Sequence, residues 1–197
     1  MNVGKKYQEK LITIPEAVSK VKSNQKVVTA MAASEPQGLL HELENRSDEL
    51  ENVNIVSCLM MGDYNFLEPE MRGTFLNETW FYGPADRENH KHGNVTYIPN
   101  NLHEAGMKKL ENDDLNIFWG TATPMDENGF FSLSLGLTYE KMMIEDENTM
   151  VVLEINENLP WTLGDTQVHI SQVDHLVENT SPLIEVPPIE PGEEEKK

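Results

Sequence analysis

Short apolar runs alternate along this chain with segments whose apolar residues recur at helical spacing. The runs are rich in Val and Ile and predict buried strands at residues 26–31, 52–60, 115–120 and 149–155. Weaker runs predict strands at residues 78–83 and 94–99 and strand pieces within residues 166–178. Helical spacing predicts helices that begin near Thr13 and Pro36, and two more at residues 101–112 and 137–146.

Strands that alternate with helices of this length form βαβ units. The expected fold class is therefore α/β, with an open, mostly parallel sheet flanked by helices. Ligands bind such sheets beyond the carboxyl ends of the strands. Three loops follow predicted strand ends and are expected to gather at that edge, namely residues 32–37, 121–129 and 156–165.

The second of these loops carries the residues of a tight turn. Pro124 ends the preceding strand, and Asn128 and Gly129 both tolerate the positive φ of a hairpin turn. Residues 130–135 then alternate in polarity, as a returning strand does. On these residues alone, the favoured interpretation is a structural hairpin.

The composition is that of a globular protein and narrows its partners. The 197 residues carry a net charge of -19, which repels both nucleic acid and anionic membrane surfaces. No apolar run has the length of a membrane span, and the first residues lack the apolar core of a secretory signal. The single cysteine, Cys58, excludes a disulfide framework, so a cytoplasmic protein is expected.

Few side chains carry a signal for chemistry. Cys58 lies in a predicted strand, where a buried small hydrophobe is favoured over a nucleophile. His90 and His92 lack cysteine partners, so a polar loop is favoured over a metal site. Glu35 follows the first strand, where a carboxylate serves either as a base or nucleophile or as a partner for the next helix dipole. The sequence has no Walker loop, nucleophile elbow or dinucleotide fingerprint.

Four stretches, in order along the chain, resemble the acetyl-CoA hydrolase/transferase family of CoA-transferases. The matches to its P-x-D-x-x-G-(F/Y) hairpin and its E-(V/I)-N-(E/D)-x-(M/L/V)-P strand-loop are Pro124–Phe130 and Glu154–Pro160. Residues 17–40 resemble its opening helix, strand and loop, with Asn24 in place of a usual glycine. Residues 92–106 resemble a further segment, so the likeness covers roughly residues 7–190.

The resemblance implies a CoA-transferase (NagB/RpiA-like) N-terminal domain over residues 1–183. A Pro/acid-rich linker or tail over residues 184–197 then leads towards a C-terminal domain that the chain lacks. In the family, CoA passes between an acyl-CoA and a small carboxylate of the acetate, butyrate or 4-hydroxybutyrate class. It does so through a glutamyl-CoA intermediate on the C-terminal half. No catalytic residue is therefore expected in this chain.

The resemblance also implies the partners of the chain. Coenzyme A and acyl-CoA enter as substrates, and no permanently bound cofactor or metal is implied. The expected partners are the acyl-CoA, a small carboxylate and a C-terminal CoA-transferase domain or subunit, and a homo-oligomer is compatible with the sequence. By their place at the sheet edge, the expected substrate-binding residues are Met31, Ser34, Glu35, Pro36, Gln37, Asn128 and Gly129.

Two other functions stay open on the sequence. The same fold serves a non-catalytic module that binds a small acid or a partner. An acetyl-CoA hydrolase that uses Glu35 as its base would act without a second half. If the chain is the N-terminal half of a CoA-transferase, an exposed apolar patch is expected where the C-terminal half docks.

Overall fold

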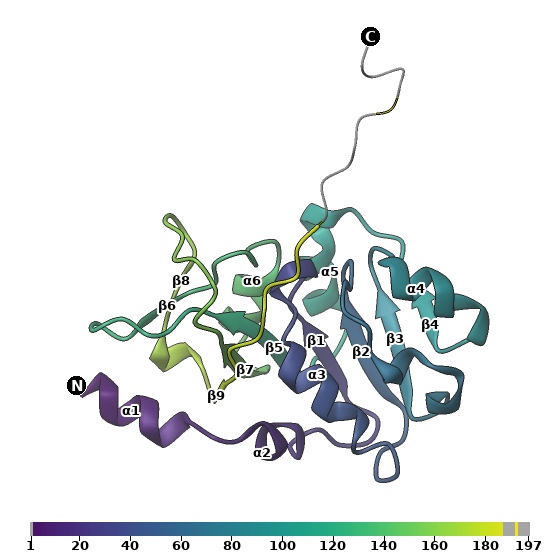
Figure 1. The fold of residues 1–197 in the computed structure, drawn as a ribbon, viewed down its shortest axis with the longest axis horizontal. Helices are drawn as coiled ribbons and strands as arrows, with labels where there is room; N and C mark the ends of the chain where they lie inside the picture. The colour runs from purple at the N-terminus through teal and green to yellow at the C-terminus, as the bar shows by residue number, and fades with distance from the viewer. Residues whose placement is uncertain (1, 187–191, 193–197) are drawn as a thin grey trace.

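A computed structural model describes residues 2–186 and Gly192. Seven strands form one sheet in the order β4-β3-β2-β1-β5-β7-β9, and every neighbouring pair is parallel. The predicted α/β class is thus confirmed (Figure 1). The strands are β1 (Lys26–Thr29), β2 (Val53–Ser57), β3 (Phe75–Thr79), β4 (Val95–Tyr97), β5 (Ile117–Ala122), β7 (Met150–Ile155) and β9 (His175–Glu178).

The direction in which strands are added reverses at β1. From β1 the chain adds β2, β3 and β4 on one side, and it then returns to add β5, β7 and β9 on the other. The loops that leave β1 and β5 therefore diverge at the carboxyl edge. Open α/β sheets bind ligands at such a switch point.

Helices cover both faces of the sheet. On one face lie α2 (Ile14–Val18) and α3 (Gln37–Glu44), and on the other α5 (Ala105–Asn112) and α6 (Glu140–Glu145). Successive strand residues alternate between the faces, so Val27 packs with the first pair and Val28 with the second. The remaining helical elements are α1 (Val3–Lys10), α4 (Pro84–Asn89), and the 3-10 turns η1 (Ala32–Ser34), η2 (Asn65–Leu67), η3 (Pro69–Met71), η4 (His90–His92), η5 (Leu102–Glu104) and η6 (Ile170–Gln172).

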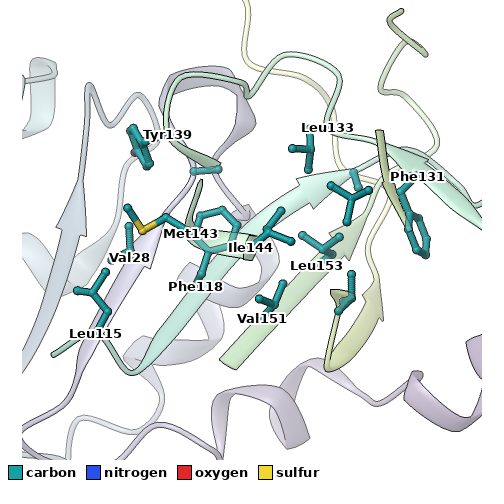
Figure 2. Close-up of a cluster of buried hydrophobic side chains, with 14 of the residues drawn as sticks. Val28, Leu115, Phe118, Phe131, Leu133, Tyr139, Met143, Ile144, Val151 and Leu153 are labelled. Atoms are coloured by element: carbon teal, nitrogen blue, oxygen red, sulfur yellow. The ribbon is translucent and has the colours of Figure 1, made fainter. Parts of the chain in front are cut away.

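Figure 2 shows the core on the α5–α6 face. Phe118 of β5 and Leu153 of β7 pack with Met143 and Ile144 of α6, and all four are buried. Full burial of an apolar side chain of this size contributes about 1.5–3 kcal/mol to stability. This packing holds α6 against the sheet and so places the loop that precedes it at the carboxyl edge.

The predicted hairpin exists but is part of a second sheet. β6 (Phe130–Ser132) pairs antiparallel with β8 (Gln167–His169). The turn itself is confirmed, because the Asp126 amide donates to the Phe130 carbonyl at 2.8 Å and Gly129 has a φ of +91°. The predicted extent of the returning strand is wrong beyond Ser132, because the backbone of Ser134 turns to a φ of +56°.

Other boundaries also differ from the sequence-based expectation. β3 begins at Phe75 rather than at residue 78, because polar Asn77 is buried inside the strand. Its side chain accepts from the Ser57 hydroxyl at 2.9 Å and donates to Asp86 at 2.7 Å, which no local pattern reveals. The linker predicted over residues 184–197 lies, beyond Val186 and apart from Gly192, outside the described residues.

Two glycines with left-handed backbones test what the hairpin contributes. A side chain on Gly129 would lie 2.8 Å from Val3 of α1, whereas one on Gly73 (φ +95°) meets nothing within 4 Å. Gly73→Ala should therefore cost only the backbone strain, about 1–2 kcal/mol. In urea unfolding, Gly129→Ala should lower the free energy of unfolding more than Gly73→Ala does, because the added methyl group also displaces α1. Equal losses would show that α1 does not depend on this turn.

Candidate functional site

The loop after β1 lies over the switch point of the sheet. This β1 loop, residues 31–36, contains Met31, the turn η1, Glu35 and Pro36. Thr121, near the end of β5, donates its hydroxyl to the Ser34 carbonyl at 2.9 Å and ties the two diverging loops together. The expected gathering of the loops after β1 and β5 is thus observed.

A buried carboxylate holds the start of the β1 loop. Glu140 of α6 is 1% exposed, and it accepts the amide of Met31 at 2.9 Å. The same carboxylate accepts the amides of Thr138 and Tyr139 at 2.6 and 2.9 Å. The side chain thus caps its own helix and fixes the first residue of the β1 loop at once.

A second buried carboxylate holds the residues that follow the β1 loop. Glu154 of β7 is fully buried and accepts the amides of Gly38 and Leu39 at 3.2 and 3.0 Å, at the start of α3. The Asn179 amide donates to the same carboxylate at 2.8 Å. Burial raises the pKa of Glu154, and its hydrogen bonds oppose that shift.

Glu35 links the β1 loop to the loop after β2. Its carboxylate accepts the amides of Met61 and Gly62 at 3.0 and 2.6 Å and the Tyr64 hydroxyl at 2.9 Å. The side chain is only 2% exposed, and burial raises its pKa to about 7 although these donors lower it. Glu35 therefore positions a neighbouring loop, and its role in substrate binding stays a prediction.

A cavity of about 490 Å³ opens between the loops that follow β1, β2, β3 and β4. Its volume is in the range of small-molecule sites, ~300–1,000 Å³. The wall is mostly apolar and aromatic, and none of its described residues is charged. The lining residues are Met31, Cys58, Leu59, Trp80, Phe81, Tyr97, Asn100, Asn101 and Leu102.

Two of the five residues other than glycine for which a positive φ is described lie beside this cavity. Leu59, in its wall, has a φ of +53°, and Ala32, next to Met31, has a φ of +51°. Such values are uncommon for residues other than glycine and cost energy that the surrounding structure must supply. Strained residues of this kind concentrate at functional sites, so the strain and the cavity mark the same place.

The thiol of Cys58 lines the cavity but is not activated. The residue is 1% exposed, which confirms the expected burial. Burial raises the pKa of the thiol to about 11, and the charges of Glu140 and Asp86 act in the same direction. At neutral pH the side chain is therefore a protonated thiol and a poor nucleophile.

The structure brings together some of the sequence-predicted site residues and separates others. Met31 lines the cavity, while Ser34, Glu35 and Pro36 are buried next to it in the same loop. The side-chain amide of Gln37 donates to the Pro182 carbonyl at 3.1 Å, so this amide is already bound to a later segment of the chain.

The hairpin residues lie apart from the β1 loop. Gly129 packs against Val3 and His169, and the Asn128 amide donates to Asp126 at 2.9 Å. No described contact joins either residue to the cavity, so their role in substrate binding stays a prediction. Sequence reasoning also missed Trp80 and Phe81, because it placed them inside a strand rather than after it.

Exposed apolar side chains lie on α6 and on the loops after β6 and β7. The Ser134 hydroxyl donates to the Pro160 carbonyl at 2.7 Å, and Lys141 pairs with Asp165, so these loops lie side by side. Leu163 is 84% exposed. We refer to this surface as the apolar edge, and its exposed members are Leu135, Leu137, Met142, Trp161 and Leu163.

The described residues hold no cluster of three or more His, Cys, Asp or Glu side chains that could bind a metal ion. His90 instead shares a 2.7 Å hydrogen bond with the Tyr82 hydroxyl. Within residues 2–186, no helix is long and apolar enough to cross a membrane.

Comparison with known proteins places this architecture. The family model described as the acetyl-CoA hydrolase/transferase N-terminal domain matches residues 1–187. The 4-hydroxybutyrate coenzyme A transferase of Clostridium kluyveri is 31% identical over 96% of this chain and 44% of its own length. The butyryl-CoA:acetate CoA-transferase of Anaerostipes caccae is 32% identical over 93% of this chain and 42% of its own.

Solved structures show the same fold. RipA from Yersinia pestis has a TM-score of 0.91 and 29% identity, covering 98% of this chain and 47% of its own. The 4-hydroxybutyrate CoA-transferase of Porphyromonas gingivalis has a TM-score of 0.75 at 25% identity. The chain thus spans a little less than half the length of these relatives.

The raised pKa of Glu35 predicts a pH dependence of stability. The group titrates near its ordinary 4.5 when unfolded and near 7 when folded, so the folded state binds the proton more tightly. The stability it contributes is full below pH 4.5 and is lost as the pH rises to about 7. In urea unfolding, the free energy of unfolding of Glu35→Gln should fall less between pH 4.5 and about 7 than that of the unaltered chain.

The same substitution should lower stability overall. A glutamine in this place turns one amide towards the backbone N–H groups, and an unmet buried donor costs about 1–3 kcal/mol. Glu70→Gln, which alters an exposed carboxyl, controls for the loss of one charge. If both variants show the same pH slope, Glu35 does not titrate in this window.

Proposed function

This chain belongs to the acetyl-CoA hydrolase/transferase family, and we propose that it is the N-terminal half of a CoA-transferase. The reaction moves CoA between an acyl-CoA and a small carboxylate. The named transferases that the chain resembles support this class, and its span of 44% of the Clostridium enzyme supports a half. Cytoplasmic acyl-CoA metabolism is part of the same proposal.

The observation that carries the proposal is a ligand-sized cavity without a reactive group. Its wall holds a protonated thiol, amides and apolar side chains, and the nearby Glu35 carboxylate is turned away into the protein. Such a wall can hold an acyl chain and exclude water, but it cannot attack a thioester. The proposal therefore places the nucleophile on a second domain.

In the proposed reaction a glutamate of the C-terminal half attacks the thioester carbonyl. CoA leaves as its thiolate, and an acyl-glutamyl anhydride remains. The thiolate then attacks the glutamyl carbonyl, which forms glutamyl-CoA and releases the first acid. The second acid takes up CoA by the reverse steps. The part of this chain is to orient the acyl group and keep water from the anhydride.

The apolar edge is the proposed docking surface for the C-terminal domain. Residues 179–186 run across the carboxyl side of the sheet (Figure 1), where Asn156 donates to the Ser181 carbonyl at 2.9 Å. A domain joined after this segment would begin on the carboxyl side of the sheet. Exposed leucines in two adjacent loops are typical of a surface that another protein domain covers.

A hydrolase that acts alone through Glu35 finds less support. The carboxylate has its hydrogen bonds from two amides and a hydroxyl, and it is buried. A base must reach the water that it activates. The non-catalytic binding module has no observation of its own, because the cavity serves both functions.

Reconstitution tests the proposal. The chain alone should show no exchange of CoA between butyryl-CoA and acetate. Exchange should appear when the C-terminal CoA-transferase polypeptide of the same organism is added. Borohydride reduction during turnover, read by mass spectrometry, should modify a glutamate of that polypeptide and none in this chain. Turnover by the chain alone, or a modified Glu35, would overturn the assignment.

The apolar edge makes a separate prediction for assembly. Leu163→Asp should weaken binding of the C-terminal polypeptide at least about tenfold, because a charge would be buried in the interface. The fold should persist, since Leu163 is 84% exposed. Gln8→Glu adds the same charge on exposed α1 and should bind like the unaltered chain. Equal affinities of the two variants in sedimentation would exclude this docking surface.

A further inference from the structure

The loop that follows β3 supplies aromatic side chains to the wall of the cavity. We refer to residues 80–83 as the β3 loop, and its first two residues, Trp80 and Phe81, line the cavity. The Trp80 ring is 4% exposed and packs edge-on against Tyr139, with 4.9 Å between the ring centroids. Phe81 is 54% exposed, so burial of its side chain contributes little to its position. Contacts of the backbone must therefore fix this part of the wall.

The β3 loop lies directly against the loop that follows β2. The Phe81 carbonyl accepts the Leu59 amide at 2.7 Å, and Leu59 also lines the cavity. A side chain on Gly83 would begin 1.8 Å from the Met60 carbonyl oxygen, so only a glycine permits this approach of the two loops. The position of Phe81 in the wall thus depends on the position of Gly83.

A buried carboxylate holds Gly83. Asp86 lies in the first turn of α4, is fully buried, and accepts the Gly83 amide at 2.8 Å. Its other oxygen accepts the side-chain amide of Asn77 at 2.7 Å, and the Ser57 hydroxyl donates to that same side chain at 2.9 Å. The side chains of Ser57, Asn77 and Asp86 are at most 1% exposed, so the loss of one partner leaves a buried polar group unpaired. These hydrogen bonds fasten the β3 loop to the end of β2 and to β3.

We infer that Asp86 is a positioning residue for this cavity: it binds the Gly83 amide, fixes the β3 loop, and so holds the aromatic wall that the acyl group contacts. The contact with the acyl group rests on the proposed function, whereas the hold on the loop is a property of this chain alone. Asp86 is not among the described residues that line the cavity, so its effect on a ligand passes through Gly83 and Phe81.

Two substitutions separate the hydrogen bonds of Asp86 from its bulk. Asp86→Ala leaves the Gly83 and Asn77 amides without their acceptor, so a displaced β3 loop, in which water reaches these amides, should become the main state. Asp86→Asn can keep both contacts. Its oxygen accepts from Gly83, and its amide donates to the Asn77 oxygen once the Asn77 amide has turned towards the Ser57 hydroxyl.

Cys58 is a native probe of the wall. It is the only cysteine of the chain, lines the cavity and is 1% exposed, so a thiol reagent reaches it only when the wall opens. Labelling with iodoacetamide at fixed pH, read by mass spectrometry, should be about a hundredfold faster in Asp86→Ala, as two unpaired buried amides permit. Asp86→Asn should label at the rate of the unaltered chain. The faster labelling should not change at low urea concentrations, which distinguishes opening of the loop from unfolding of the chain.

Asn94→Ala controls for a general loss of stability. Asn94 is 1% exposed, and its side-chain amide donates to the Leu67 and Glu68 carbonyls at 2.6 and 2.8 Å, outside the β3 loop. Its removal should lower the free energy of unfolding and leave the urea-independent labelling rate of Cys58 unchanged. Equal labelling rates in Asp86→Ala and Asn94→Ala would show that Asp86 does not hold the wall.

Kinetics of the reconstituted enzyme test the link to the acyl group. With the C-terminal polypeptide present and acetate saturating, Asp86→Ala should raise the KM for butyryl-CoA about fivefold or more, because molecules with a displaced loop bind the acyl group poorly. Asp86→Asn should restore the KM. A purely structural defect would instead reduce the concentration of active enzyme, which lowers the apparent kcat at an unchanged KM.

The outcomes separate this inference from the proposed function. If the unaltered chain shows no exchange with the C-terminal polypeptide, the proposed function fails, and the labelling of Cys58 still decides whether Asp86 holds the β3 loop. If exchange occurs and Asp86→Ala labels faster at an unchanged KM, the proposed function stands and the positioning role is wrong.

Discussion

Three buried carboxylates hold the carboxyl edge of this sheet together without a cation. Glu35, Glu140 and Glu154 are each no more than 2% exposed, and each accepts at least two backbone amides. Loops at strand ends leave amides without partners, and carboxylates are strong acceptors for them. The β1 loop, its neighbours and the start of α3 keep their positions because these carboxyl groups accept backbone amides.

The use of these carboxylates as acceptors for backbone amides accounts for the neutral lining of the cavity at the carboxyl edge of the sheet. The carboxylates of Glu35 and Glu140 already accept backbone amides of the loops. The described residues that line the cavity are all neutral. A left-handed Leu59 and Ala32 are tolerated because the carboxylates over-determine the loops around them. The result is a wall of fixed loops, as the proposed function requires of a domain that positions an acyl group for a nucleophile on a second half.

The sequence predicts the sheet well because apolar periodicity reports burial directly. The runs that contain Val27, Phe118 and Leu153 are strands whose faces alternate as expected. The site is harder, because it depends on contacts between distant residues. Nothing near Glu35 in the sequence indicates that the Met61 amide and the Tyr64 hydroxyl will donate to it. The buried polar residue Asn77 made the predicted strand begin too late, so Trp80 and Phe81 were assigned to the strand and not to the loop after it. Asn24, by contrast, has the φ of +65° that its place at a usual glycine implies.

The charge distribution argues for a division of labour between two halves. A chain with a net charge of -19 is a poor receiver for the phosphates of CoA, whereas an uncharged acyl tail is indifferent to that field. Under the proposed function, a neutral cavity in an acidic domain would hold the acyl end of the substrate, and the second half would hold the nucleotide end. Under the same proposal, apolar walls around the acyl group would keep water from the anhydride.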